Sequence, residues 1–258
     1  MDRFFVFVVG SIIGSFLNVC IYRIPKRQSV VFPPSHCPHC KKNIHWYDNI
    51  PILSYIILGG RCSFCHKRIR PRYILIELLT AFLILGLFLF LGMGPKFIIY
   101  SALVSALIVV SFIDLEIQEI PDEITLGGMV IAVIFSFLFP EIHDTPIKGM
   151  AFYQSVAGLI TGGALIYSMG LIGSLIFKKE AMGGGDIKLM AMIGAAIGWK
   201  LTVLTFFIAP ISGAIVGSVK KWIKGVDAVP YGPHLALAAV ISIFFGESIL
   251  RTLACGLW

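Results

Sequence analysis

The chain has 258 residues, of which 57% are hydrophobic and only 14% are charged, and its mean hydropathy is +0.90. This composition excludes a soluble globular domain and predicts an all-α membrane protein that crosses the bilayer several times. We interpret the formal net charge of +7 as an insertion signal and an attraction to anionic lipid, and we expect no nucleic-acid partner.

Eight apolar segments are predicted to be transmembrane helices, because a helix needs roughly 20 residues to cross the hydrocarbon core. They cover residues 4–22, 73–92, 97–115, 123–140, 151–177, 186–199, 201–219 and 233–250. The sixth is short and rich in Gly and Ala, so we expect it to pack inside the bundle, with a re-entrant path as the alternative. Basic residues follow the first segment, in "YRIPKR", which is atypical of a cleaved signal peptide, so this helix is expected to stay in the mature protein.

The positions of Lys and Arg predict the orientation of these helices. Sixteen of the 21 basic residues lie in the segments 23–72, 178–188 and 220–224. Basic loops stay on the cytoplasmic side of a membrane. We therefore expect a multi-pass protein of the cytoplasmic (inner) membrane with both termini outside.

The polar segment 23–72 contains two Cys-x-x-Cys pairs, "CPHC" and "CSFC", separated by 21 residues. Such pairs bring four thiolates together as a tetrahedral site, which suits structural zinc. Disulfides are the competing interpretation, and a reducing cytoplasm disfavours them. Four sulfur ligands leave no open position for water, so no hydrolysis is expected at the metal. The neighbouring histidines are interpreted as surface residues, although one of them could replace a ligand. The expected ligands are Cys37, Cys40, Cys62 and Cys65.

Two acidic residues at the ends of apolar segments are candidates for catalysis. Asp114 ends the third predicted span and Asp186 begins the sixth, so the expected topology places both at the cytoplasmic edge of the membrane. An ionisable group at that depth is costly, which favours a functional role. Two facing carboxylates can share a proton, one acting as general base toward water while the other protonates a peptide carbonyl. The alternative for Asp186 is that it caps the N-terminus of its helix.

The surroundings of the two aspartates support their selection. Three glycines precede Asp186, in "GGGD", and glycines let an extended peptide approach the backbone closely. Asp114 is flanked by Phe112, Ile113 and Leu115. The other acids near Asp114 have simpler interpretations: Glu116 and Glu119 as solvated loop residues, and Asp122 and Glu123 as first-turn residues of a helix that begins after Pro121.

Five blocks along the chain together resemble the type IV prepilin peptidases: "GSFLNVCIYRIP", the cysteine pairs with "DNIPILSY", "SFIDLEIQEIPDEITL", "GGGDIKLMAMIGAAIGW" and "VPYGPHLALAA". The resemblance implies an intramembrane aspartyl peptidase of the Gly-x-Gly-Asp kind, with Asp114 and Asp186 as the catalytic pair. Such enzymes cleave the basic leader of type IV prepilins or pseudopilins after a glycine at the cytoplasmic face, for pilus assembly or type II secretion. Many members then methylate the new N-terminal residue with S-adenosylmethionine.

The resemblance also implies a division of labour along the chain. Methyl transfer is associated with the first helix, 1–22, and the zinc-binding loop, 23–72, whereas 73–258 would form the peptidase domain. Members without the cysteines still cleave. No Gly-rich motif of a soluble nucleotide-binding domain is present. The candidates for binding S-adenosylmethionine are therefore polar residues of the first helix, the loop and the second helix: Asn18, Arg23, Asp48, Asn49 and Glu77.

Two of these candidates are open to other interpretations, and the function of the whole chain has alternatives as well. Asn18 could make an interhelical hydrogen bond and Asp48 an ion pair, whereas Glu77 lies one turn inside a span, where a structural role is harder to assign. A transporter whose acids relay protons or bind ions is an alternative function, and it would place carboxylates near mid-bilayer beside broken helices. A zinc-anchored scaffold of a secretion machine and a peptidase without methyltransferase activity are the others.

Overall fold

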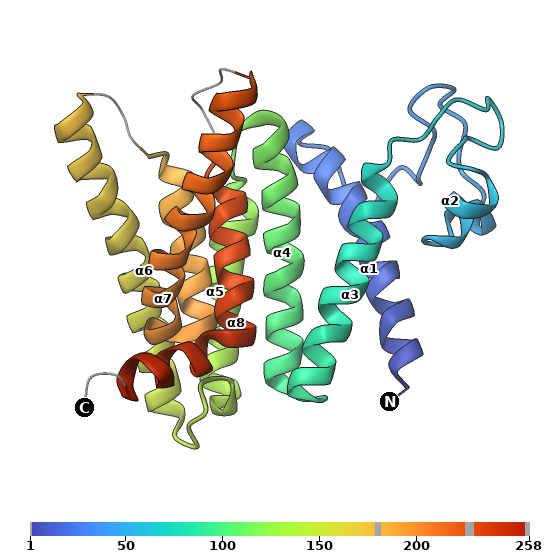
Figure 1. Ribbon diagram of the computed structural model, residues 1–258. Helices are drawn as coiled ribbons and strands as arrows, with labels where there is room; N and C mark the ends of the chain where they lie inside the picture. The colour runs from blue at the N-terminus through green and yellow to red at the C-terminus, as the bar shows by residue number, and fades with distance from the viewer. Residues whose placement is uncertain (1, 179–181, 225–229, 256–258) are drawn as a thin grey trace. The chain divides into compact units, whose positions relative to one another are not determined.

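The computed structural model describes residues 2–178, 182–224 and 230–255, and these are helices and loops with two isolated β-bridges (Figure 1). The predicted all-α class is confirmed for this part of the chain. The chain forms two compact units, residues 1–92 and 93–258, which are described one at a time. The domain limits expected at residues 22 and 72 concern activity, which packing does not test, and they stay predictions.

In the first unit, two long helices pack through small residues. α1 (Arg3–Arg23) contacts α3 (Arg72–Leu91). A Cβ atom at Gly10 would lie 2.8 Å from the Cα of Ala81, and one at Gly14 would lie 2.7 Å from the Cα of Glu77. These glycines, one turn apart, therefore let the two backbones approach as closely as membrane helices commonly do.

The segment between α1 and α3 contains little regular structure. It holds the 3-10 turns η1 (Ile24–Lys26) and η2 (Trp46–Asn49) and one short helix, α2 (Leu53–Ile57). Its apolar stretch 49–60 contains α2, which is far too short to cross a membrane. A segment with so little regular structure has little core of its own, which is typical of small metal-binding loops.

The second unit contains the remaining long helices. They are α4 (Pro95–Ile117), α5 (Asp122–Leu138), α6 (Lys148–Phe177), α7 (Gly184–Lys224) and α8 (Gly232–Cys255), with the 3-10 turn η3 (Pro140–His143) between α5 and α6. α7 packs against both α6 and α8. The hydroxyl of Thr205 on α7 donates a hydrogen bond to that of Ser242 on α8, at 2.9 Å.

α7 turns back on itself at Gly198. This glycine has φ +78° and ψ 165°, values outside the helical region. The two halves of α7 lie side by side in Figure 1. A Cβ atom at Gly162 of α6 would contact both the carbonyl of Met190 and the side chain of Thr202, which lie on opposite sides of the break. Residues 189–198, before and at the turn, are all buried. The expectation that the sixth segment packs inside the bundle is therefore confirmed.

The number of membrane spans differs from the sequence expectation. Six helices of the described residues are long and apolar enough to cross a membrane: α1, α3, α4, α6, α7 and α8. The predicted fourth span is α5, which has only 17 residues. The predicted sixth and seventh spans form one helix interrupted at Gly198, because helical hydrogen bonding resumes directly after the glycine. Eight transmembrane helices are thus not confirmed, whereas a multi-pass helical architecture is.

Candidate functional site

Asp114 lies in the last turn of α4 and is only 5% exposed. Its Oδ2 atom accepts a hydrogen bond from the backbone N–H of Gly232, at the start of α8, at 2.9 Å. A Cβ atom at position 232 would lie 2.7 Å from the same oxygen, so a side chain there would collide with the carboxylate. Glycine therefore allows α8 to hold the carboxylate of Asp114 through its backbone.

Asp186 lies in the first turn of α7 and is half-buried. Its carboxylate interacts electrostatically with that of Asp114. The start of α7 comes close to the end of α4 because Gly185 packs on the α4–α5 loop, where a Cβ atom would lie 2.9 Å from the Cβ of Ile120. Two acids that are 72 positions apart thus meet inside one compact unit.

The capping alternative for Asp186 holds in part. Asp186 is the third residue of α7, so it does not occupy the N-cap position itself. Its carboxylate nevertheless takes a hydrogen bond from the backbone of Gly183, just before the helix, as third-position acids often do. The contact with Gly183 coexists with the electrostatic interaction between the carboxylates of Asp186 and Asp114.

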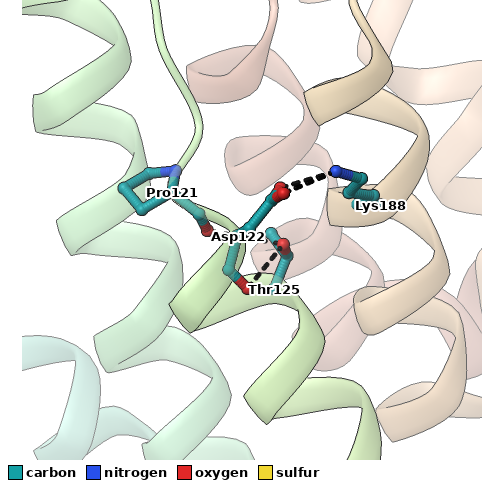
Figure 2. A network of polar contacts seen from close by, with 4 residues as sticks. All are labelled: Pro121, Asp122, Thr125 and Lys188. Atoms are coloured by element: carbon teal, nitrogen blue, oxygen red, sulfur yellow. Dashed lines mark hydrogen bonds and ion pairs between the residues drawn. The ribbon is translucent and has the colours of Figure 1, made fainter.

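An ion pair that sequence reasoning missed ties the starts of α5 and α7 together (Figure 2). Lys188 Nζ lies 2.7 Å from both carboxylate oxygens of Asp122. Asp122 and Glu123 occupy the first turn of α5, as predicted, and the Thr125 hydroxyl is 3.4 Å from the Pro121 carbonyl oxygen. Lys188 stands two residues after Asp186, so the pair restrains the turn of α7 that carries that aspartate. Nothing in the spacing of the sequence reveals Asp122 as its partner.

The first unit brings the four predicted cysteines together. Their sulfur atoms all lie within 4.8 Å of one another, and the group could hold a metal ion. The four cysteines are free of disulfides. Sulfurs about 2.3 Å from a tetrahedral zinc ion would lie roughly 3.8 Å from one another, and the Sγ atoms of Cys37 and Cys65 are 3.8 Å apart. The donor set and its spacing therefore fit zinc, and no histidine belongs to the cluster.

The two cysteine pairs have the same local backbone. The N–H of Cys37 donates to the carbonyl of Lys42, and the N–H of Cys62 donates to that of Lys67, both at 3.0 Å. An isolated β-bridge flanks each pair. The chain thus contains two equivalent knuckles, which present their thiols to a common centre.

A cavity of about 320 Å³ lies beside this cluster, within the first unit. Residues of α1, α2, α3 and the cysteine loop line it. The lining includes Cys37 and Cys62 and every residue predicted to bind S-adenosylmethionine: Asn18, Arg23, Asp48, Asn49 and Glu77. The structure therefore gathers around one space five residues that the sequence spreads over three segments.

Asn18 and Arg23 have clear structural contacts in the cavity wall. The side-chain amide of Asn18 donates to the carbonyl of Tyr73 at 3.1 Å, so the expected interhelical hydrogen bond is confirmed. Its Oδ1 atom is buried and has no hydrogen-bond partner among the described residues, which leaves an acceptor available to a ligand. The guanidinium of Arg23 donates to the carbonyls of Ser29 and Pro33, at 3.0 and 2.6 Å, and so anchors the loop.

Glu77 holds an unusual turn of the loop against α3. Its Oε2 atom accepts a hydrogen bond from the N–H of Ile52 at 2.7 Å. Ile52 has φ +64° and ψ −52°, a conformation that β-branched residues rarely adopt and that persists only under constraint. Among the ion pairs of the described residues, none involves Glu77 or Asp48. The ion pair considered for Asp48 is therefore not seen among the described residues. The wall of the cavity also carries basic residues: Arg23, Lys67, Arg68, Arg70 and Arg72.

These features define a class of protein: a multi-pass helical membrane protein with a four-cysteine cluster in one unit and two converging carboxylates in the other. Two family models match the chain: "Bacterial Peptidase A24 N-terminal domain" over residues 8–91 and "Type IV leader peptidase family" over residues 101–218. Each match falls within one of the two compact units. The two matches together leave α8 outside them.

Curated relatives extend the match. A "Prepilin leader peptidase/N-methyltransferase" from Pseudomonas aeruginosa is 32% identical over 95% of this chain and 91% of its own length. A "Type 4 prepilin-like proteins leader peptide-processing enzyme" from Escherichia coli is 34% identical over 92% and 91%. A relative from Myxococcus xanthus is 37% identical over 83% of this chain but 61% of its own length. No match is found among solved structures. The chain belongs to the type IV leader peptidase family, as the resemblance implied.

Proposed function

We propose that this chain is a bifunctional membrane enzyme that removes the basic leader from type IV prepilins or pseudopilins and then methylates the new N-terminal residue. The observation that carries the first activity is the convergence of Asp114 and Asp186 from α4 and α7. Family membership supports both activities. The test is incubation of the purified full chain with a prepilin and S-adenosylmethionine, followed by mass spectrometry of the product.

The pair of aspartates suits hydrolysis of a peptide bond without a covalent intermediate. Because two close carboxylates repel each other when both are ionised, they hold one proton between them. The ionised member accepts a proton from water as the water oxygen adds to the amide carbon, and the protonated member donates its proton to the carbonyl oxygen. The carboxyl group that took the proton from water then donates it to the amide nitrogen, and the other carboxylate takes a proton back from a hydroxyl of the tetrahedral adduct. Collapse of the adduct breaks the C–N bond, and the nitrogen leaves as an amine. Carboxylates alone thus suffice for the reaction.

We infer eight membrane crossings with both termini outside and the aspartates at the cytoplasmic edge. A straight helix as long as α7, 41 residues, would measure about 60 Å, twice the hydrocarbon thickness of about 30 Å. The break at Gly198 supports two crossings instead. α5, with 17 residues, would span about 26 Å, which suffices with slight thinning of the bilayer. The concentration of basic residues in 23–72, 178–188 and 220–224 supports this orientation.

Reversing the charge of either Asp122 or Lys188 alone is expected to slow cleavage, and reversing both charges together is expected to restore it. Lys188→Asp places two acids together beside Asp186, and Asp122→Lys places two cations there. Because the pair is about half exposed, we expect each single reversal to lower kcat/KM by no more than roughly fivefold, the equivalent of about 1 kcal/mol. The double variant should recover most of the rate. Glu123→Lys is the matched control, and a double variant slower than either single variant would contradict a positioning role.

For the second activity, we infer that the four cysteines hold zinc and that S-adenosylmethionine binds in the neighbouring cavity, where it would supply the methyl group. A volume of about 320 Å³ lies within the range of small-molecule sites. The unpartnered Oδ1 of Asn18 offers an acceptor for a polar group of the ligand. The carboxyl groups of Glu77 and Asp48 in the cavity wall offer acceptors for an amine of the ligand. Zinc would keep its structural role, since four thiolates complete its coordination.

Glu77→Gln is expected to impair methylation and spare cleavage. Glutamine keeps the size of the side chain and an oxygen that accepts the N–H of Ile52, but it removes the negative charge from the cavity wall. Because a hydrogen bond to a charged group contributes about 1.5–3 kcal/mol, we expect methylation to fall by about tenfold or more. The measurement is the methylated fraction of a processed pilin by mass spectrometry, with binding of S-adenosylmethionine by calorimetry as a second readout. Glu119→Gln in the second unit is the control, and unchanged methylation and binding in Glu77→Gln would remove Glu77 from the site.

A further inference from the structure

Tyr231 stands beside the two aspartates with a hydroxyl group that has no partner among the described residues. It directly precedes Gly232, whose N–H binds Asp114. Its hydroxyl oxygen is buried and makes no hydrogen bond to the described part of the chain. Buried tyrosine hydroxyls normally find a partner, and leaving one unsatisfied costs about 1–3 kcal/mol. The unpartnered hydroxyl of Tyr231 beside the two aspartates therefore indicates that a bound ligand accepts its hydrogen bond.

The ring of Tyr231 is held between α7 and the start of α8. A Cβ atom at Gly213 of α7 would lie 3.8 Å from the ring carbon Cε2. The hydroxyl interacts electrostatically with Asp186. Two adjacent residues thus contact the two acids. The N–H of Gly232 binds Asp114, and the hydroxyl of Tyr231 interacts electrostatically with Asp186.

The neighbouring polar side chain on α8 already has a contact. His234 Nδ1 is 3.1 Å from the hydroxyl oxygen of Ser212 on α7, so this histidine is engaged in helix packing. The Tyr231 hydroxyl, in contrast, is available as a donor over the whole neutral range. Burial, followed by the charge of Asp186, raises the pKa of Tyr231 to about 12, and the group stays protonated well above neutral pH.

We propose that the hydroxyl of Tyr231 donates a hydrogen bond to the carbonyl oxygen of the scissile peptide bond and strengthens it as negative charge develops there during water addition. This inference rests on the proposed cleavage by Asp114 and Asp186. Tyr231 keeps its proton throughout, so it stabilises the tetrahedral adduct while the two aspartates exchange protons with water and substrate. Preorganised donors of this kind act on kcat more than on substrate binding, because the charge they face exists only in the transition state.

The test compares the full-length wild type with Tyr231→Phe on a purified prepilin. Phenylalanine keeps the ring against Gly213 and removes only the hydroxyl. We expect kcat to fall by about 10²-fold, within the range for loss of one oxyanion donor, with KM changed by less than about threefold. Tyr167→Phe, on the exposed face of α6, is the matched control and should cleave like the wild type. Thermal unfolding of each variant shows whether the fold is retained.

A second readout separates a donor from a packing residue. Site-specific replacement of Tyr231 by a ring-fluorinated tyrosine keeps the hydroxyl but lets it ionise at lower pH. If the hydroxyl donates to the carbonyl oxygen, the alkaline limb of the kcat profile moves to lower pH; a packing role leaves the limb in place. A kcat of Tyr231→Phe within about twofold of wild type, an effect on KM alone, or an unmoved alkaline limb would each overturn the proposal. Absence of cleavage by the wild type would instead refute the proposed function itself.

Discussion

Asp114→Asn and Asp186→Asn are each expected to abolish leader cleavage. An amide can neither accept the proton of the attacking water nor share a proton with its neighbour, so loss of either carboxylate removes acid–base catalysis, worth roughly 10²–10⁴-fold for each group. In Asp114→Asn the new side-chain amide would still offer an oxygen to the N–H of Gly232, so the packing of α8 on α4 should persist. The measurement is conversion of a prepilin to its mature form, followed by gel and by mass spectrometry.

Suitable controls are the acids that lie close in sequence but outside the pair. Glu119→Gln and Asp122→Asn should cleave within about fivefold of wild type, because the first lies in a loop and the second only supports a half-exposed ion pair. Both catalytic-pair variants should still methylate a peptide that is already cleaved, since the cavity belongs to the other unit. A variant at Asp114 or Asp186 that retains wild-type cleavage would exclude the dyad. Cleavage also separates this function from a transporter or a scaffold, neither of which would hydrolyse the substrate.

The extent of most helices followed from composition. The bounds of α1, α3 and α4 lie within two residues of the predicted segments, because an uninterrupted apolar stretch has few ways to satisfy its backbone in lipid other than as a helix. Composition did not predict that the sixth and seventh predicted spans are joined directly, without a loop between them. The cause of this direct join is one residue, Gly198, whose positive φ reverses the chain without a polar loop. Lys200 did mark the boundary between the two predicted spans, two residues after Gly198, but nothing in the sequence showed that a single glycine makes the turn.

The site shows the same contrast between local and distant information. The cysteine cluster was predictable because ligand spacing is a local pattern, and the two aspartates were prominent because each is charged within an apolar context. The contact of Gly232 with Asp114 joins residues 118 positions apart, and the ion pair of Lys188 with Asp122 joins residues 66 apart. Neither contact leaves a mark on the sequence near its members. The block "VPYGPHLALAA" carries part of the family resemblance, but only the folded chain shows what Tyr231 and Gly232 contact.

Cys37→Ser combined with Cys62→Ser is expected to eliminate methylation and leave cleavage largely intact. The change removes one ligand from each knuckle, and both cysteines also line the cavity. A loop with only one short helix would obtain much of its folding free energy from the proposed metal, so the cavity should lose its shape without it. The aspartates lie in the separate compact unit, which contains none of the ligands. Processed pilin should therefore accumulate in the unmethylated form.

Metal analysis ties this result to zinc. The purified wild type should contain about one equivalent of zinc, and the double variant less than about a tenth of that. Cys20→Ala, which alters a buried cysteine of α1 outside the cluster, should keep both the metal and methylation. Chelation of the wild type should reproduce the double variant, because the shape of the cavity then depends on the ion and not on the thiols themselves. Parallel loss of cleavage in the double variant would show that the two units act together, and it would contradict the assignment of one activity to each.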